Sequence, residues 1–250
     1  MLSFVVMNEY SFLFYCLLFV VAFLYASVGH GGASGYLALM ALFSFSAEQM
    51  KSSAIFLNIL VSAIAFAQYY HAGFFKIKLF FPFAISSIPA AFLGGMLSVN
   101  AQIYKKILAI LLLFPIFRLM GLSPQERETL EKQNVLLSLF IGLVIGFLSG
   151  LIGIGGGIIL SPVILLLRWA NMKETAAVSA LFILVNSLAG LGGLSLQGLN
   201  TSADIYVMLL VALSGGLLGS YLGAKKFKHQ VLRVLLVSVL SIACIKLLFT

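Results

Sequence analysis

Two glycine-rich segments inside hydrophobic stretches are the residues of this chain best suited to binding a ligand. They are Gly29-His30-Gly31-Gly32-Ala33 and Gly153-Ile154-Gly155-Gly156-Gly157. Glycine lets the backbone turn with positive φ and leaves its amide N–H groups uncovered by a side chain. If a helix begins directly after each turn, its free N–H groups and its positive dipole end favour an anion. The two segments therefore predict an anion-binding site built largely from backbone.

The two glycine segments occupy equivalent points of an internal duplication. They begin at positions 29 and 153, 124 residues apart in a chain of 250 residues. Each follows a Phe-Leu pair, Phe23-Leu24 in the first copy and Phe147-Leu148 in the second. We therefore expect two homologous halves whose glycine turns face a common site.

The composition indicates which class of protein must position these turns. Hydrophobic residues make up 62% of the chain and charged residues 9%, and the mean hydropathy is +1.15. Apolar runs of about 20 residues can cross a bilayer core as helices, and the lack of alternating polarity argues against a barrel. The net charge of +8 does not indicate nucleic acid, because the basic residues cluster in short loops, where they orient the chain and meet anionic lipids. The sequence predicts an all-α, polytopic membrane protein with lipids as partners.

We expect five helical segments in each half. In the first half they are residues 10–28, 34–45, 52–70, 79–99 and 103–119, and in the second 135–152, 158–169, 175–194, 205–222 and 231–248. The chain thus divides into a first membrane repeat, 1–121, a polar cytoplasmic linker, 122–134, and a second membrane repeat, 135–250. Ser123 and Pro124 favour a short surface helix in the linker.

The second segment of each half is only about a dozen residues long, which makes it a candidate half-helix. If every segment changes side, eleven of the fifteen Lys and Arg residues gather on one face, whereas nine do so if the short segments re-enter. The stronger bias favours five crossings per half. The two repeats are then inverted, and the N-terminus faces outward.

The second glycine turn resembles a known family signature. The string is Gly150-Leu151-Ile152-Gly153-Ile154-Gly155-Gly156-Gly157-Ile158-Ile159-Leu160-Ser161-Pro162. It is similar to the signature of the TauE/SafE family, the sulfite exporter or toluenesulfonate uptake permease family, and the resemblance covers nearly the whole chain. It implies a secondary transporter that moves a small anion, such as sulfite or an organosulfonate, across the bacterial inner membrane. No catalytic residue, metal or cofactor is expected, and a homo-oligomer is compatible with the family.

Eleven residues are the candidates for substrate binding. They are Gly29, His30, Gly31, Gly32, Ser34 and Asn58 in the first half, and Gly153, Gly155, Gly156, Gly157 and Asn186 in the second. The first half departs from the family pattern, because His30 stands where the second copy has Ile154 and Ala38 where it has Pro162. His30 could donate a hydrogen bond to an anion, or it could be satisfied by nearby backbone carbonyls.

Several other interpretations stay open. The glycines could serve only close helix packing, and polar residues such as Asn58, Ser62, Ser179, Asn186 and Ser187 could bridge helices rather than line a path. Gly32-Ala33-Ser34-Gly35 matches the motif around a rhomboid protease nucleophile, which would need His71 or His229 beside Ser34. A membrane scaffold without transport is a third possibility. Lys51 and Lys173 follow the short segments and are explained more simply as orientation signals.

Overall fold

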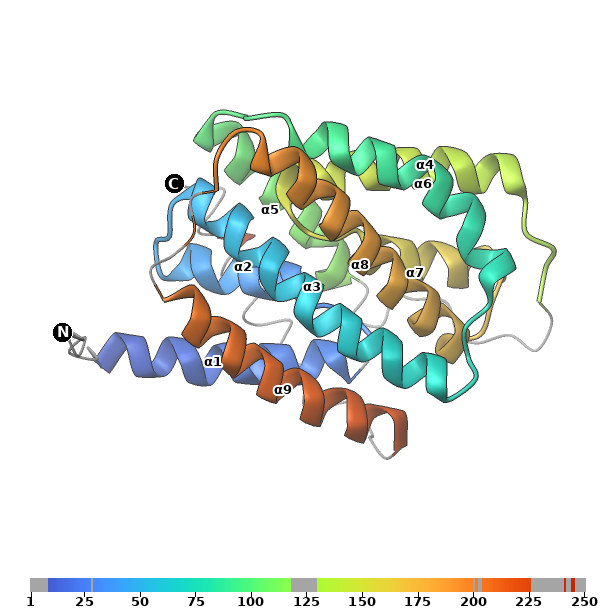
Figure 1. Ribbon diagram of the computed structural model, residues 1–250, viewed down its shortest axis with the longest axis horizontal. Coiled ribbons are helices and arrows are strands. Elements are labelled where there is room, and N and C mark those ends of the chain that lie inside the picture. The colour runs from blue at the N-terminus through green and yellow to red at the C-terminus, as the bar shows by residue number, and fades with distance from the viewer. Residues whose placement is uncertain are drawn as a thin grey trace.

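The computed structural model describes residues 9–27, 29–117, 130–199, 201, 204–225, 241, 244 and 245. Within these ranges the chain forms nine α-helices and no strand (Figure 1). The helices are α1 (Glu9–Ala26), α2 (Ala33–Leu42), α3 (Ala47–His71), α4 (Ile77–Gly95), α5 (Ala101–Phe117), α6 (Val135–Ile152), α7 (Gly157–Leu166), α8 (Met172–Ser195) and α9 (Ile205–Lys225). Nine of the ten predicted segments are therefore present. Most of the tenth, and most of the expected linker helix, lies outside the described residues.

In the part of the chain that the structure describes, five helices are long and apolar enough to cross a membrane: α3, α4, α6, α8 and the Ile205–Leu222 part of α9. Large apolar side chains point outward from several of them, including Leu136 and Phe140 on α6 and Leu210 on α9. A water-soluble protein rarely exposes such a surface. The prediction of a polytopic helical membrane protein is confirmed.

The two longest helices begin earlier than their hydropathy predicts. Ser46 accepts a hydrogen bond from Gln49 N–H in a capping box before α3, and Asn171 does the same for Glu174 before α8. These boxes stand 125 positions apart and satisfy otherwise unpaired first-turn amides. Because their polar residues lower the local hydropathy, the predicted starts at 52 and 175 fall inside the helices.

The short second helix of each half is confirmed. α2 and α7 have ten residues each, or about 15 Å at 1.5 Å per residue. Gly32, at φ +92°, is the N-cap of α2, and Gly156, at φ +75°, is the N-cap of α7. Both turns use the left-handed region that glycine enters without steric cost.

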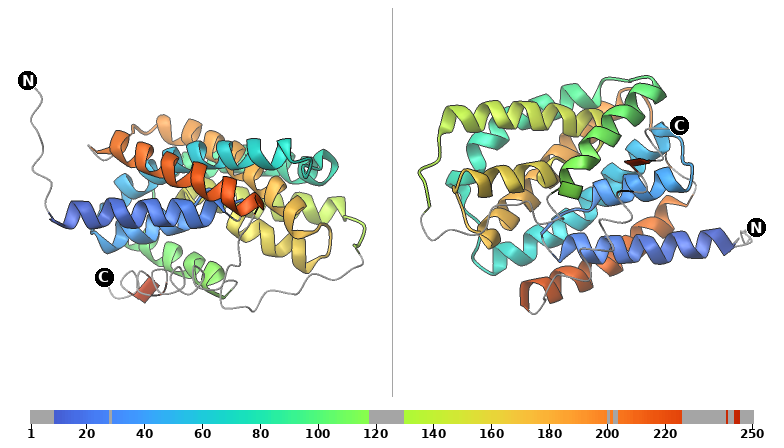
Figure 2. Two further views of the ribbon diagram at one scale, coloured as in Figure 1. Left: turned by 90° about the horizontal axis from the view of Figure 1, so that it is seen from below. Right: turned by 180° about the vertical axis from the view of Figure 1, so that it is seen from behind.

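The two halves pack against each other through equivalent pairs of helices. α4 of the first half packs on α6 of the second, and α9 packs on α1, while α3 and α8 lie side by side between these pairs. A Cβ at Gly94 would collide with the Phe147 carbonyl, and a Cβ at Gly219 with the Phe23 carbonyl. The two crossings are the same contact with the halves exchanged, and small residues permit this close approach. Figures 1 and 2 show that α1 and α6 run in opposite directions.

Candidate functional site

The two glycine turns meet at the middle of the two central helices. Asn58 is the twelfth residue of α3, and Ile183 is the twelfth residue of α8. A Cβ at Gly31 would lie 2.5 Å from Asn58 Oδ1 and 3.0 Å from Ile183 Cγ2. A Cβ at Gly155 would lie 2.6 Å from Asn58 Nδ2 and 2.7 Å from the same Ile183 carbon. One amide and one aliphatic side chain thus separate the two turns.

The Asn58 amide is held in a defined orientation between the turns. Its Oδ1 accepts a hydrogen bond of 3.1 Å from the Ala33 N–H at the start of α2. Because that oxygen is fixed by a donor, the Nδ2 group must face Gly155 on the other side. Asn58 Nδ2 is buried and finds no hydrogen-bond acceptor in the described part of the chain.

A second buried polar atom lies beside the same glycine. Ser187 Oγ is 3.2 Å from the position of a Cβ on Gly155, and it too has no partner among the residues described. Buried polar groups are nearly always hydrogen-bonded, so these two atoms are candidates to bind a ligand. The first turn of α7 begins two residues after this glycine, and its Gly157 and Ile158 N–H groups have no acceptor within their own helix. Amide and hydroxyl donors beside a helix N-terminus suit an anion.

His30 connects the first turn to the second half. Its Nε2 lies 2.9 Å from Ser161 Oγ on α7, and Ser161 Oγ is also 2.7 Å from Ser179 Oγ on α8. Ser161 Oγ also lies 2.9 Å from the Gly157 carbonyl, one turn earlier in α7, to which its hydroxyl can donate. The imidazole thus hydrogen-bonds a hydroxyl of the other half, and it is almost fully buried.

Ser34 is hydrogen-bonded to a tyrosine of α1. Its Oγ hydrogen-bonds the Tyr25 hydroxyl at 2.8 Å. His71, which a protease would need beside it, is exposed at the last position of α3 and makes a ring contact with Tyr70. His229 lies outside the described residues.

The remaining predicted residues have different surroundings. Asn186 Nδ2 donates to the Phe182 carbonyl one turn earlier in its own helix at 2.8 Å, and its Oδ1 is buried with no partner among the described residues. Its neighbour Ser187 lies beside Gly155. Gly156 and Gly157 pack against the side chains of Phe182 and Ile183. Both glycines therefore allow close helix contact, and Gly156, at φ +75°, also forms the turn.

Gly29 and Gly153 flank the turns and meet equivalent positions of the central helices. A Cβ at Gly29 would lie 2.6 Å from the Ala176 Cβ, and one at Gly153 would lie 3.1 Å from the Lys51 carbonyl oxygen.

Lys51 is not a loop residue, as its sequence position suggested, but a buried residue of α3. Lys173, the other lysine after a short segment, is exposed and places its Nζ 4.9 Å from the centre of the Phe74 ring.

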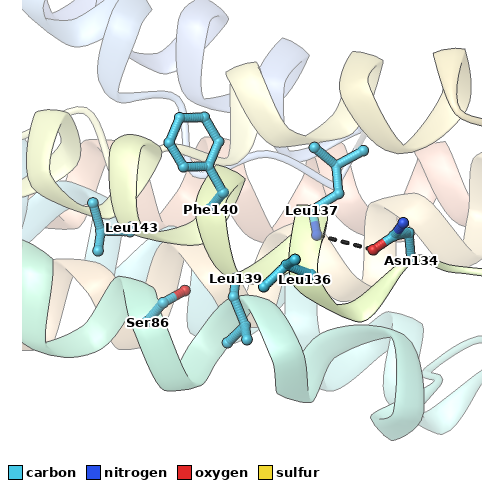
Figure 3. Close-up of a pocket in the computed structure, with 7 residues that line it drawn as sticks. All are labelled: Ser86, Asn134, Leu136, Leu137, Leu139, Phe140 and Leu143. Carbon is cyan, nitrogen blue, oxygen red and sulfur yellow. Dashed lines mark hydrogen bonds between the residues drawn. The ribbon is translucent and has the colours of Figure 1, made fainter.

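A groove on the molecular surface lies away from the glycine turns. Figure 3 shows it between α4, which contributes Ser86, and α6, which contributes most of the remaining lining. Asn134 accepts a hydrogen bond from Leu137 N–H at one end, and Phe140 and Leu143 are exposed along it. The groove is almost entirely apolar, so it offers nothing to hold an anion.

Comparison with known proteins agrees with this architecture. The sequence model of the family described as Sulfite exporter TauE/SafE matches residues 14–247. A probable membrane transporter protein of Sinorhizobium fredii is 36% identical over 242 residues, covering 92% of this chain and 95% of the relative. A probable membrane transporter protein of Methanocaldococcus jannaschii is 27% identical over 201 residues, covering 75% of this chain and 73% of the relative. No solved structure is significantly similar to the chain. With nearly its whole length matched, the chain belongs to the TauE/SafE family of membrane transporters.

Proposed function

We propose that this protein is a secondary transporter that moves a small sulfur-containing anion, sulfite or an organosulfonate, across the bacterial inner membrane. The observation that carries the proposal is the pair of unpartnered polar atoms, Asn58 Nδ2 and Ser187 Oγ, beside the Gly155 turn. A sulfonate or sulfite group presents several acceptor oxygens, which can take hydrogen bonds from these atoms and from the first-turn amides of α7. The family description, sulfite exporter, supports the sulfur chemistry.

The depth of the site suits transport. Asn58 and Ile183 lie midway along helices of 25 and 24 residues, so a substrate between them is near the bilayer centre if both helices span. Helix breaks at this depth, contributed by two repeats, are a recurrent arrangement in secondary transporters. The opposite directions of α1 and α6 support inverted repeats, whose relative movement would open the site to each side in turn.

Flux into liposomes tests the function. Purified protein is reconstituted, and uptake is measured for sulfite, sulfoacetate and toluenesulfonate, with chloride and phosphate as comparison anions. We expect saturable uptake of at least one sulfur anion and little uptake of the comparison anions. Insertion into liposomes without uptake of any anion would contradict the proposal and favour a scaffold.

The site itself is tested by a pair of glycine variants. Gly155→Ala places a methyl group against Asn58 Nδ2 at a backbone φ of +72°. Gly73→Ala imposes the same left-handed strain at φ +78° but meets nothing within 4 Å. Uptake should be lost in the first variant and kept in the second. Equal uptake in both variants would show that the Gly155 turn does not contact the substrate.

A further inference from the structure

Lys51 is a buried cation at a position where neither burial nor the dipole of its own helix favours a positive charge. It lies in the second turn of α3 and is 7% exposed. Its Nζ donates to the Gly95 carbonyl at 3.3 Å and to the Leu97 carbonyl at 3.2 Å, at the C-terminal end of α4. These uncharged acceptors replace water only in part, so burial of the ammonium is costly. A lysine near a helix N-terminus is also on the unfavourable side of that helix's dipole.

Lys51 lies on the same face of α3 as Asn58, which borders the candidate anion site. Lys51, Ile55 and Asn58 follow at spacings of four and three residues, which places them on one side of the helix. This side faces the second glycine turn along its length. A Cβ at Gly153 would lie 3.3 Å from Ile55 Cγ1 and 3.5 Å from Lys51 Cγ, while Gly155 faces Asn58. Lys51 is thus two helical turns, or about 10 Å, from Asn58 toward one end of α3.

The duplicated position in the other half has no charge. Ala176 stands 125 residues after Lys51, and it meets Gly29 as Lys51 meets Gly153. A small residue is therefore sufficient to pack this contact. The lysine adds a cation to only one of the two approaches to the site.

We propose that Lys51 selects anions at one mouth of the substrate path, an inference that rests on the proposed transport function. In the conformation described, the ammonium is bound to the Gly95 and Leu97 carbonyls, and the path beside Gly153 is closed. When this end opens, the ammonium exchanges the two carbonyls for an oxygen of the entering anion. The anion then passes along the α3 face to Asn58. Closure returns the ammonium to α4, where it also stabilises the helix C-terminus.

The test compares charge variants of Lys51 in liposomes with sulfite as the probe. Lys51→Met keeps most of the aliphatic stem and removes the charge, whereas Lys51→Arg keeps the charge. We expect Lys51→Met to raise the KM for sulfite about 10-fold, as loss of a charge-assisted hydrogen bond would, with Lys51→Arg within about 3-fold of the wild type. Lys173→Met is the matched control, because Lys173 is exposed, and its KM should stay unchanged.

Chemical restoration of the charge separates selection from a purely structural contact. Lys51→Cys, made with Cys16→Ala and Cys244→Ala, is treated with 2-bromoethylamine, which forms a lysine-like thioether, or with neutral iodoacetamide. If the Lys51→Cys protein regains the wild-type KM for sulfite after treatment with 2-bromoethylamine but not with iodoacetamide, the proposal is supported. This result does not depend on whether Lys51→Met folds. An unchanged KM with lower Vmax and melting temperature in Lys51→Met would overturn it. If wild-type protein carries no anion, the transport proposal itself fails.

Discussion

The two glycine turns share one backbone plan but differ in how much of their hydrogen-bonding capacity is used. At the first turn, Asn58 Oδ1 takes the Ala33 N–H, and His30 reaches Ser161 on α7. At the second turn, Asn58 Nδ2 and Ser187 Oγ are unpartnered in the described structure. The first turn therefore joins the two halves, whereas two polar groups beside the second turn have no partner among the described residues, and we propose that they bind the substrate.

One difference between the central helices contributes to this asymmetry. The capping boxes of α3 and α8 are 125 positions apart, and the same offset places Ile183 opposite Asn58. Asparagine carries an acceptor and a donor on one planar group, so one side chain can serve both turns. Isoleucine can only fill the space. The two halves thus share one backbone frame and differ in the side chain at its centre.

The largest effect should come from filling the second turn. Gly155→Ala meets Asn58 Nδ2 and Ile183 Cγ2 within 2.7 Å, on a backbone already at positive φ. Overpacking of this kind costs about 1–3 kcal/mol, in addition to about 1–2 kcal/mol for the strained backbone. We expect sulfite uptake to fall at least about 10-fold relative to Gly73→Ala, which shares only the strain.

The next effect concerns the donor that faces the second turn. Asn58→Asp keeps an acceptor for Ala33 N–H but replaces Nδ2 with an anionic oxygen. Loss of a hydrogen bond to a charged group costs about 1.5–3 kcal/mol, or about 10- to 150-fold in the ratio of Vmax to KM. Initial rates of sulfite uptake measure this ratio. Ser62→Ala is the control on the same helix, since its hydroxyl bonds the Ile59 carbonyl at 3.5 Å. Equal ratios for the two variants would contradict a role for Asn58 in binding.

The contact between His30 and Ser161 at the first turn predicts coupling between the halves. His30→Gln and Ser161→Ala each remove one side of the 2.9 Å contact. Residues in direct contact couple by about 0.5–3 kcal/mol, so the double variant should lose less melting temperature than the two single variants together. Additive shifts in a thermal unfolding assay would show that His30 does not join the halves.

The smallest effect is expected at the N-terminal end of α8, where Ala176 occupies the position equivalent to Lys51 in α3. There Glu174, whose side chain is 11% exposed, forms an ion pair with Lys76 at 2.6 Å, and the Lys76 side chain is 55% exposed. Because water reaches the Lys76 ammonium, the pair contributes about 1 kcal/mol, and glutamine can still complete the capping box with Asn171. Glu174→Gln should change the melting temperature by less than about 4 °C and leave sulfite uptake within about 2-fold. A large loss of uptake would mean that this end also carries an essential charge.

Sequence reasoning located the glycine turns and the short helices because each has a local signal. Glycine runs, apolar segment length and the internal repeat are visible along the chain. The choice of Asn186 over Ser187 depended on how far α8 is rotated, which apolar periodicity does not define when a helix is buried on most sides. The contact between His30 and Ser161 joins positions 131 residues apart, so no local pattern predicts it. The 125-residue offset between the capping boxes would have placed Ile183 opposite Asn58.

The most direct test of the second turn as the anion site is an experimental structure with selenite, a heavier analogue of sulfite. Anomalous scattering from selenium identifies the bound anion independently of the protein atoms. We predict a selenium peak beside the Gly155 turn, with anion oxygens within hydrogen-bond distance of Asn58 Nδ2 and Ser187 Oγ. A peak elsewhere, for example at the first turn or in the groove between α4 and α6, with none at Gly155, would contradict the account.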